Sequence, residues 1–229
     1  MNFPILTTII FLPLLSSIFI FLTKSSVDNR NETYVALFTS IANLFLTIFL
    51  WYLFDKNSYD FQFIEEANWI NGFIKFKLGV DGISILFIVL TTFITPICII
   101  SCINSVKTRV KEFLIAILIL ETFMIGVFCS LDLVIFYLFF EAGLIPMFLI
   151  IGIWGGARRV YSAFKFFLYT LLGSVLMLVA IISIYWITGT TDVVQLYEIG
   201  IDVKYQNLLW LAFFSSFAVK TPMWPVHTW

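Results

Sequence analysis

Three ionisable side chains lie inside long apolar runs of the sequence, namely Glu121, Glu141 and Lys220. If these runs are membrane helices, a rise of about 1.5 Å per residue places each side chain roughly 14 to 20 Å from one helix end, near the middle of the bilayer. A charge at that depth costs about 2.5 to 3.5 kcal/mol, so such residues face the bundle interior and usually mark an ion or proton route. We interpret them as candidate proton-transfer groups.

Glu141 and Lys220 together suit proton transfer. Burial favours the neutral form of a carboxyl and of an amine, whereas bringing the two together restores both charges. Moving the partners apart would therefore release a proton, without a metal or an organic cofactor. The alternative is a buried pair that only holds two helices together, but buried ion pairs stabilise less than apolar packing. The sequence favours transport for this pair.

The other candidates have an ordinary structural explanation of equal weight. Glu121 could be a single protonated carboxyl that is hydrogen-bonded to a neighbouring helix. His227, the only histidine, has the unperturbed pKa of about 6.5 that suits a relay, but a backbone carbonyl at the membrane interface could satisfy it. Lys165, like Glu121, is a secondary candidate for proton transfer. A hydrated relay also needs polar groups along the way, for which the candidates are Ser215, Ser216, Thr221, Thr170 and Ser174.

The composition excludes several classes of protein and of site. Of 229 residues, 61% are hydrophobic and 12% are charged, and the mean hydropathy is +1.04, so a water-soluble globule is excluded. A formal net charge of -1 leaves no basic surface for nucleic acid, and the lipid bilayer is the main expected partner. A single histidine excludes a multi-histidine metal site, and Cys98 and Cys102 lack a third ligand, so we expect no metal.

Seven apolar runs are long enough to cross a membrane. They cover about 3–23, 33–54, 80–104, 112–130, 132–153, 163–187 and 207–229. In the seventh, Pro222 and Pro225 should break the helix, which membranes tolerate only where protein or water surrounds the break. The absence of a polar tail after this segment indicates a fragment of a longer protein. The fold expected is an all-α polytopic membrane protein with a broken seventh helix.

The connections between these helices predict local structure and orientation. In residues 60–79, Asn71-Gly72 followed by alternating residues predicts a small β-hairpin, with an irregular loop as the alternative. Asp81 and Asp132 are expected to cap the helices that follow them. Positive residues gather in alternate loops and place the N-terminus outside. Eight of them, Lys24, Arg30, Lys107, Arg109, Lys111, Arg158, Arg159 and Lys165, oppose four, Lys56, Lys75, Lys77 and Lys204.

Several stretches from about residue 60 to the end resemble one family. They are Leu78-Gly79-Val80-Asp81-Gly82-Ile83-Ser84, Phe136-Tyr137-Leu138-Phe139-Phe140-Glu141 with Pro146-Met147, Trp154-Gly155-Gly156, Lys165-Phe166-Phe167-Leu168-Tyr169-Thr170 with Gly173-Ser174, and Phe217-Ala218-Val219-Lys220 with Pro222 and His227-Thr228-Trp229. The sequence is similar to the antiporter-like, proton-translocating membrane subunits of respiratory complex I (NADH-quinone oxidoreductase), in the subunit M branch, which is subunit 4 in mitochondria.

The resemblance implies a role for the two central residues and an extent for the chain. Glu141 matches the family's helix-5 glutamate and Lys220 its lysine on a broken helix 7, together the input half of a proton channel. Residues 1–110 are then helices 1–3 with the outer hairpin, and 111–229 begin a module that is truncated here. The chain looks like the N-terminal half of a protein of about fourteen helices and could not translocate protons alone.

The resemblance also implies the surroundings. Flavin, iron-sulfur clusters and quinone belong to partner subunits in this family, and the partners expected here are the other membrane-arm subunits, including neighbouring antiporter-like ones. The location is a bacterial plasma (inner) membrane, with the mitochondrial inner membrane as the alternative. Two other functions stay open, a subunit of a multisubunit sodium/proton antiporter and a structural membrane scaffold in which the buried charges only fix helix register.

Overall fold

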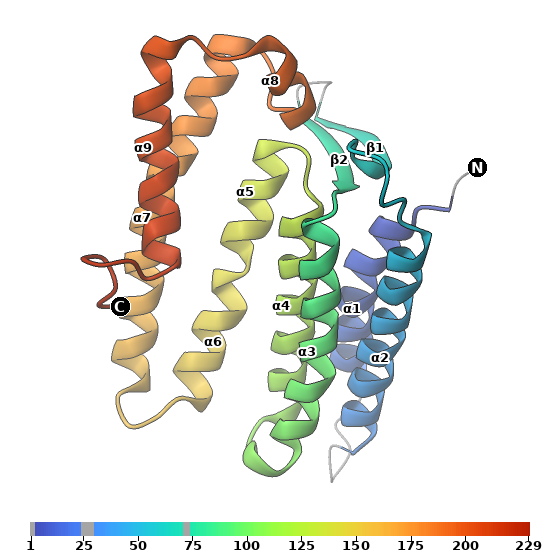
Figure 1. Cartoon of the computed structure of the whole chain (residues 1–229). Coiled ribbons are helices and arrows are strands. Elements are labelled where there is room, and N and C mark those ends of the chain that lie inside the picture. Colours follow the sequence, from blue (N-terminus) through green and yellow to red (C-terminus); the bar gives the residue numbers. More distant parts are fainter. Residues whose placement is uncertain (1–2, 24–29, 71–73) are drawn as a thin grey trace. The chain divides into compact units, whose positions relative to one another are not determined.

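A computed structural model of the chain describes residues 3–23, 30–70 and 74–229. Apolar runs of 18 or more residues give most of the helices, and a polar connection gives two strands (Figure 1). The elements are α1 (Ile5–Leu22), α2 (Arg30–Leu53), β1 (Gln62–Ile70), β2 (Ile74–Val80), α3 (Ser84–Ser105), α4 (Val110–Cys129), α5 (Leu133–Ala142), α6 (Leu144–Trp154), α7 (Arg159–Thr188), α8 (Val193–Ile199) and α9 (Val203–Lys220). The expected helical fold is confirmed.

The chain forms two compact units. Unit 1 comprises residues 1–66 and 78–130, and unit 2 comprises 67–77 and 131–229. The division that the sequence analysis places after residue 110 concerns the functional module and stays a prediction.

Unit 1 is a bundle of α1, α2, α3 and α4, packed side by side (Figure 1). One of its clusters of buried side chains consists of Ile20, Ala36, Ile99, Leu114 and Leu118, which come from all four helices. Polar side chains satisfy both ends of α1. The Glu65 carboxylate accepts hydrogen bonds from the Leu6 and Thr7 amides at 2.7 and 2.9 Å, and the Lys111 ammonium donates to the Thr23 carbonyl at 2.7 Å.

The expected hairpin is present, because β1 and β2 pair as a two-stranded sheet. The Asn71-Gly72 turn proposed for it lies outside the described residues, as does Lys24 from the orientation argument. The expected caps are also present. The Asp81 carboxylate accepts from the amides of Ile83 and Ser84, and that of Asp132 from the amides that begin α5.

The single helix expected over 132–153 is interrupted at Gly143, which separates α5 from α6. Proline has no backbone N–H and crowds the carbonyl four residues earlier, so Pro146 removes the hydrogen bond that the Ala142 carbonyl would accept. Gly143 keeps helical dihedrals, φ -61° and ψ -20°, so the interruption is local. It falls one turn or less from Glu141.

The segment expected as a helix over 207–229 also differs from the prediction. A short helix, α8, precedes it, and α9 begins earlier, at Val203, and ends at Lys220, just before Pro222. Residues 221–229 form turns and irregular structure within the described part of the chain, so a second helical half of a broken helix is not seen there. Among the described residues, six helices or helix pairs are long and apolar enough to span a membrane, and α9 is not one of them. The span count of seven and the orientation stay predictions.

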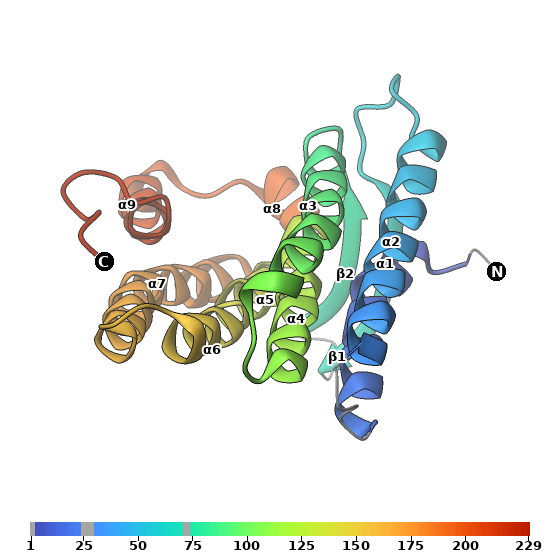
Figure 2. The ribbon, with the colours of Figure 1, turned by 90° about the horizontal axis from the view of Figure 1, so that it is seen from below.

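Unit 2 packs α7 against α9 and α6 against α7 (Figure 2). Gly173 in α7 permits the close approach of α9, because a Cβ atom at that position would lie 2.9 Å from the Cβ of Val219. A buried polar cluster ties the strand end to two helix starts. The Lys77 ammonium donates to Asp192 at 2.5 Å, and Thr191 donates to Asp132 at 2.6 Å. Asp132 and Asp192 also cap α5 and α8, so this cluster fixes where both helices begin.

Candidate functional site

Helix α5 carries Glu141 into the interior of unit 2. The Asp132 cap satisfies the amides of Val134 and Ile135 at the first turn, and Glu141 follows on the last turn before the interruption at Gly143. Both carboxyl oxygens of Glu141 are buried, and neither has a hydrogen-bond partner among the described residues. Buried carboxyl oxygens without donors are rare and costly, which is typical of a functional group rather than of a structural one.

Helix α9 carries Lys220 as its last residue. Its ammonium donates a hydrogen bond of 3.0 Å to the Phe140 carbonyl and lies 3.5 Å from the centroid of the Phe140 ring. A carbonyl and a ring face stabilise a cation more weakly than a carboxylate does. Lys220 is therefore held beside α5 by weak partners.

Lys220 and Glu141 are close enough to interact electrostatically, but the ammonium does not bond to the carboxyl oxygens in the described structure. The sequence brings these two residues together as expected, while the direct ion pair is replaced by the contact with Phe140. The structure thus shows a carboxyl and an amine that are neighbours without being bonded.

Aromatic rings pack around Phe140, whose ring lies against the Lys220 ammonium. The Phe140 ring stacks on Phe136 at 5.5 Å and meets Phe217 edge to face at 6.1 Å between centroids. Phe213 continues the cluster one turn earlier on α9, at 6.3 Å from Phe217. The side chains of these phenylalanines carry no hydrogen-bond acceptors. The acceptors near the ammonium are therefore the Phe140 carbonyl and the Glu141 carboxyl.

Polar side chains recur at four-residue spacing on the three helices of this site. Tyr137 precedes Glu141 by one turn on α5, and Ser174 on α7 lies near both, although its hydroxyl donates to the Leu171 carbonyl at 2.9 Å. Thr170 lies one turn before Ser174, and both side chains are almost fully buried. The sequence analysis did not single out Tyr137, although its position four residues before Glu141 indicated that the two side chains share a helix face.

Ser216 lies one turn before Lys220 on α9, at 1% exposure, and its hydroxyl has no partner among the described residues. Together with Glu141 it leaves three buried oxygens unsatisfied in unit 2. Such atoms in a polar site are places where ordered water binds. The arrangement can therefore hold and move protons.

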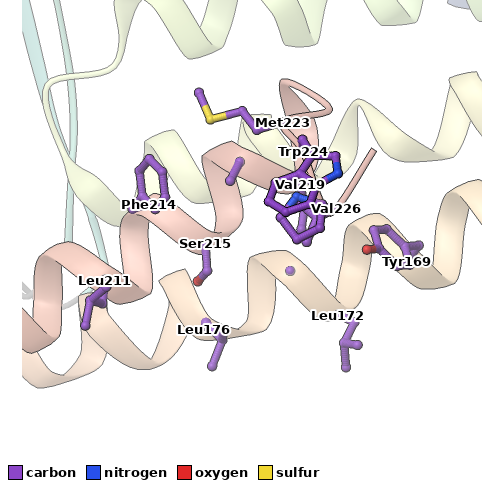
Figure 3. A pocket seen from close by; sticks show the side chains of 13 residues that line it. Tyr169, Leu172, Leu176, Leu211, Phe214, Ser215, Val219, Met223, Trp224 and Val226 are labelled. Atoms are coloured by element: carbon purple, nitrogen blue, oxygen red, sulfur yellow. The ribbon is translucent and has the colours of Figure 1, made fainter. Parts of the chain in front are cut away.

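A groove of about 450 Å³ opens between α7 and α9 and is lined by neither Glu141 nor Lys220 (Figure 3). Its wall is almost wholly apolar and includes Leu172, Leu176, Phe214 and Trp224, with the Ser215 hydroxyl among them. The Ser215 hydroxyl is bonded back to the Ala212 carbonyl at 2.9 Å. An apolar wall of this kind suits lipid or protein side chains better than a proton route.

The remaining candidates of unit 2, His227 and Lys165, are not among the described contacts of Glu141 and Lys220. His227 is exposed in the irregular segment after α9, and the described contacts do not bring it to Glu141 or Lys220. That segment folds back on the helices, because the Trp229 indole donates to the Val219 carbonyl at 2.8 Å and the Lys165 ammonium to the Thr228 carbonyl.

Glu121 belongs to unit 1, on α4. It is 3% exposed, and its carboxyl accepts a hydrogen bond of 3.0 Å from the Asn43 amide of α2. In the described part of the chain, no three residues of His, Cys, Asp or Glu are arranged to hold a metal ion.

These observations define a polytopic helical membrane subunit with a carboxyl whose oxygens are buried beside a half-buried amine. The family model described as NADH:quinone oxidoreductase/Mrp antiporter, TM, matches residues 130–229. The chain is 53% identical to the NADH-quinone oxidoreductase subunit M of Rhodobacter capsulatus and 48% identical to the NADH-ubiquinone oxidoreductase chain 4 of Marchantia polymorpha, over 98% of its length in each case. The chain belongs to the NADH:quinone oxidoreductase/Mrp antiporter membrane-subunit family, which confirms the resemblance.

The chain spans about half the length of these relatives, 47% and 46% respectively. A solved structure of respiratory complex I from Thermus thermophilus with bound NADH matches with a TM-score of 0.85 at 26% identity, over 98% of this chain and 45% of that one. The fold described here is therefore that of the matching half of such a subunit.

Proposed function

We propose that this chain is part of a membrane subunit of respiratory complex I that translocates protons, driven by NADH:quinone electron transfer in partner subunits. The observation that carries the proposal is the buried Glu141, whose two carboxyl oxygens have no hydrogen-bond partner among the described residues although the Lys220 ammonium lies nearby. A carboxyl that only held helices together would be bonded to a side chain of a neighbouring helix, as Glu121 is to Asn43.

The chemistry follows from two alternative partners for one ammonium. Bonded to the Phe140 carbonyl and ring, Lys220 leaves Glu141 free to take up a proton. If the flexible lysine side chain turns to Glu141, the two groups form a charge-assisted pair and the carboxyl proton is released. Each movement of the ammonium changes the proton affinity of Glu141, so the pair acts as a switch.

Tyr137, Ser174, Thr170 and Ser216 supply hydroxyl groups from which water-mediated proton transfer to this pair is built. His227 and Lys165 are proposed as outlying relay groups near the end of α9 and the start of α7. Glu121 has only the neutral Asn43 as a described partner, in unit 1, and stays outside this route.

The assembly proposed is a multi-pass subunit in the bacterial plasma membrane, with the mitochondrial inner membrane as the alternative and the N-terminus outside. Bacterial relatives and the complex I structure support the membrane location, and the distribution of Lys and Arg among the loops supports the orientation. Its partners are the other membrane-arm subunits, including neighbouring antiporter-like ones. The flavin, iron-sulfur clusters and quinone site belong to partner subunits.

The test replaces Glu141 by Gln in membranes that carry the full-length subunit. NADH:quinone turnover and proton uptake should fall by about 100-fold, which is the loss of rate expected when a general acid–base group is removed. NADH oxidation by an artificial acceptor that bypasses the membrane arm should persist. The matched control is Glu198→Gln, the same change at an exposed glutamate on α8, which should leave all three rates unchanged.

The same experiment decides between transport and a scaffold. If Glu141 only fixes helix register, Glu141→Gln should reduce the amount of assembled complex and spare the turnover of whatever assembles. Persistence of all three rates in fully assembled complex would contradict the proposed role of Glu141.

A further inference from the structure

Helix α2 connects to each of its three neighbours in unit 1 through one line of polar side chains. Thr39, Asn43 and Thr47 follow one another at four-residue spacing and are all buried. Thr39 donates to Ser16 of α1 at 2.9 Å, Asn43 to Glu121 of α4 at 3.0 Å, and Thr47 pairs with Thr92 of α3 at 2.8 Å. The central link is the one of these three that contains an ionisable group.

The link between Asn43 and Glu121 lacks one hydrogen-bond donor. The Asn43 amide donates to one oxygen of Glu121, which leaves Oε2 of Glu121 and Oδ1 of Asn43 as two buried acceptors without a donor among the described residues. Asn43 is 0% and Glu121 3% exposed. Unsatisfied buried acceptors are expensive, and an ionised carboxylate here would add the cost of an unpaired charge.

The geometry points to a protonated Glu121 that forms a neutral acid–amide pair with Asn43 and so links α4 to α2. One proton on the carboxyl supplies the donor that the pair lacks, and the Asn43 amide already supplies the complementary bond. The inference holds for either orientation of the amide, since rotating it by half a turn still leaves a carbonyl facing a carboxyl oxygen. It is independent of the function proposed for Glu141.

The surroundings agree with a neutral group. Both threonine links beside it on α2 are neutral as well. Asn43 is the described partner of Glu121, and no cationic side chain in the described residues interacts with it, in contrast to Glu141 beside Lys220. Interhelical hydrogen bonds of this kind hold membrane helices together without a charge at bilayer depth.

Infrared difference spectroscopy tests the protonation directly. Spectra of the membrane complex with the full-length subunit are compared between wild type and Glu121→Gln at neutral pH. The inference predicts that one protonated-carboxyl C=O band of the wild type is missing from the spectrum of the variant. Loss of carboxylate bands in the variant instead would overturn it, and would mean that ordered water supplies the missing donors to an ionised Glu121.

A double-mutant cycle tests the pair. Glu121→Gln keeps a donor and an acceptor facing Asn43, so the amount of assembled complex in detergent should be unchanged. Glu121→Leu leaves the Asn43 amide without a hydrogen-bond partner, and the amount of assembled complex should fall about threefold. Adding Asn43→Leu to Glu121→Leu should recover part of that loss. Thr39→Val, which removes the neighbouring bond to Ser16, serves as the control and should act additively with Glu121→Leu. Additivity of the Asn43 and Glu121 changes would contradict the pair.

Discussion

Two buried glutamates, Glu121 in unit 1 and Glu141 in unit 2, have opposite surroundings. Glu121 faces a neutral amide, and the two threonine links beside it on α2 are neutral too. Glu141 has a cation nearby and two oxygens without partners in the described structure. We propose that the same residue type serves two purposes, cohesion between helices at Glu121 and proton exchange at Glu141.

The neighbours of a membrane-buried carboxyl indicate its role better than its depth does. A neutral partner with matching hydrogen bonds allows one stable protonation state. A movable cation whose own partners are weak allows two states that interconvert. Only the second arrangement can accept and release protons in turn.

The largest expected effect in unit 2 is that of Lys220→Arg. Arginine keeps the charge, but its planar, rigid guanidinium cannot move between the Phe140 carbonyl and Glu141 as the compact lysine ammonium does, so the proposed switch stops. NADH:quinone turnover of the assembled complex should fall about 100-fold. Lys204→Arg, at an exposed position on the same helix, should leave turnover unchanged. Full activity of Lys220→Arg would mean that the positive charge alone is sufficient and would weaken the contrast with Glu121.

A smaller effect is expected from Gly173→Ala, which separates α7 from α9. The new Cβ would lie 2.9 Å from the Cβ of Val219, next to Lys220, so α9 must shift. Overpacking costs about 1 to 3 kcal/mol, and we expect turnover to fall about tenfold. Gly152→Ala is the control, because its Cβ would meet Ala163 at an ordinary 3.5 Å. Equal turnover in both variants would show that the position of α9 is not critical.

The smallest effect should follow Tyr137→Phe, which removes a hydroxyl near Ser174 and Glu141. Loss of one hydrogen-bonding group is worth about 1 kcal/mol, so turnover should fall about fivefold. Tyr197→Phe, on the exposed face of α8, provides the comparison. If Tyr137→Phe matches that control, the tyrosine does not belong to the route.

The sequence was sufficient to predict most of the helices, the hairpin and the proximity of Glu141 to Lys220, because apolar length and rare charges within apolar runs are strong signals. The sequence did not predict contacts that depend on long-range packing. The interruption at Gly143 had a local signal in Pro146, whereas the link between Asn43 and Glu121 joins residues 78 positions apart and had no signal in the sequence. The Phe140 contact of Lys220 likewise depends on how α9 packs.

Proton uptake during NADH:quinone turnover, measured side by side for Glu121→Gln and Glu141→Gln in proteoliposomes containing the assembled complex, tests the contrast most directly. Glu121→Gln should stay within about twofold of wild type, since Gln preserves both bonds to Asn43, whereas Glu141→Gln should lose about 100-fold. Equal losses in the two variants would contradict the account.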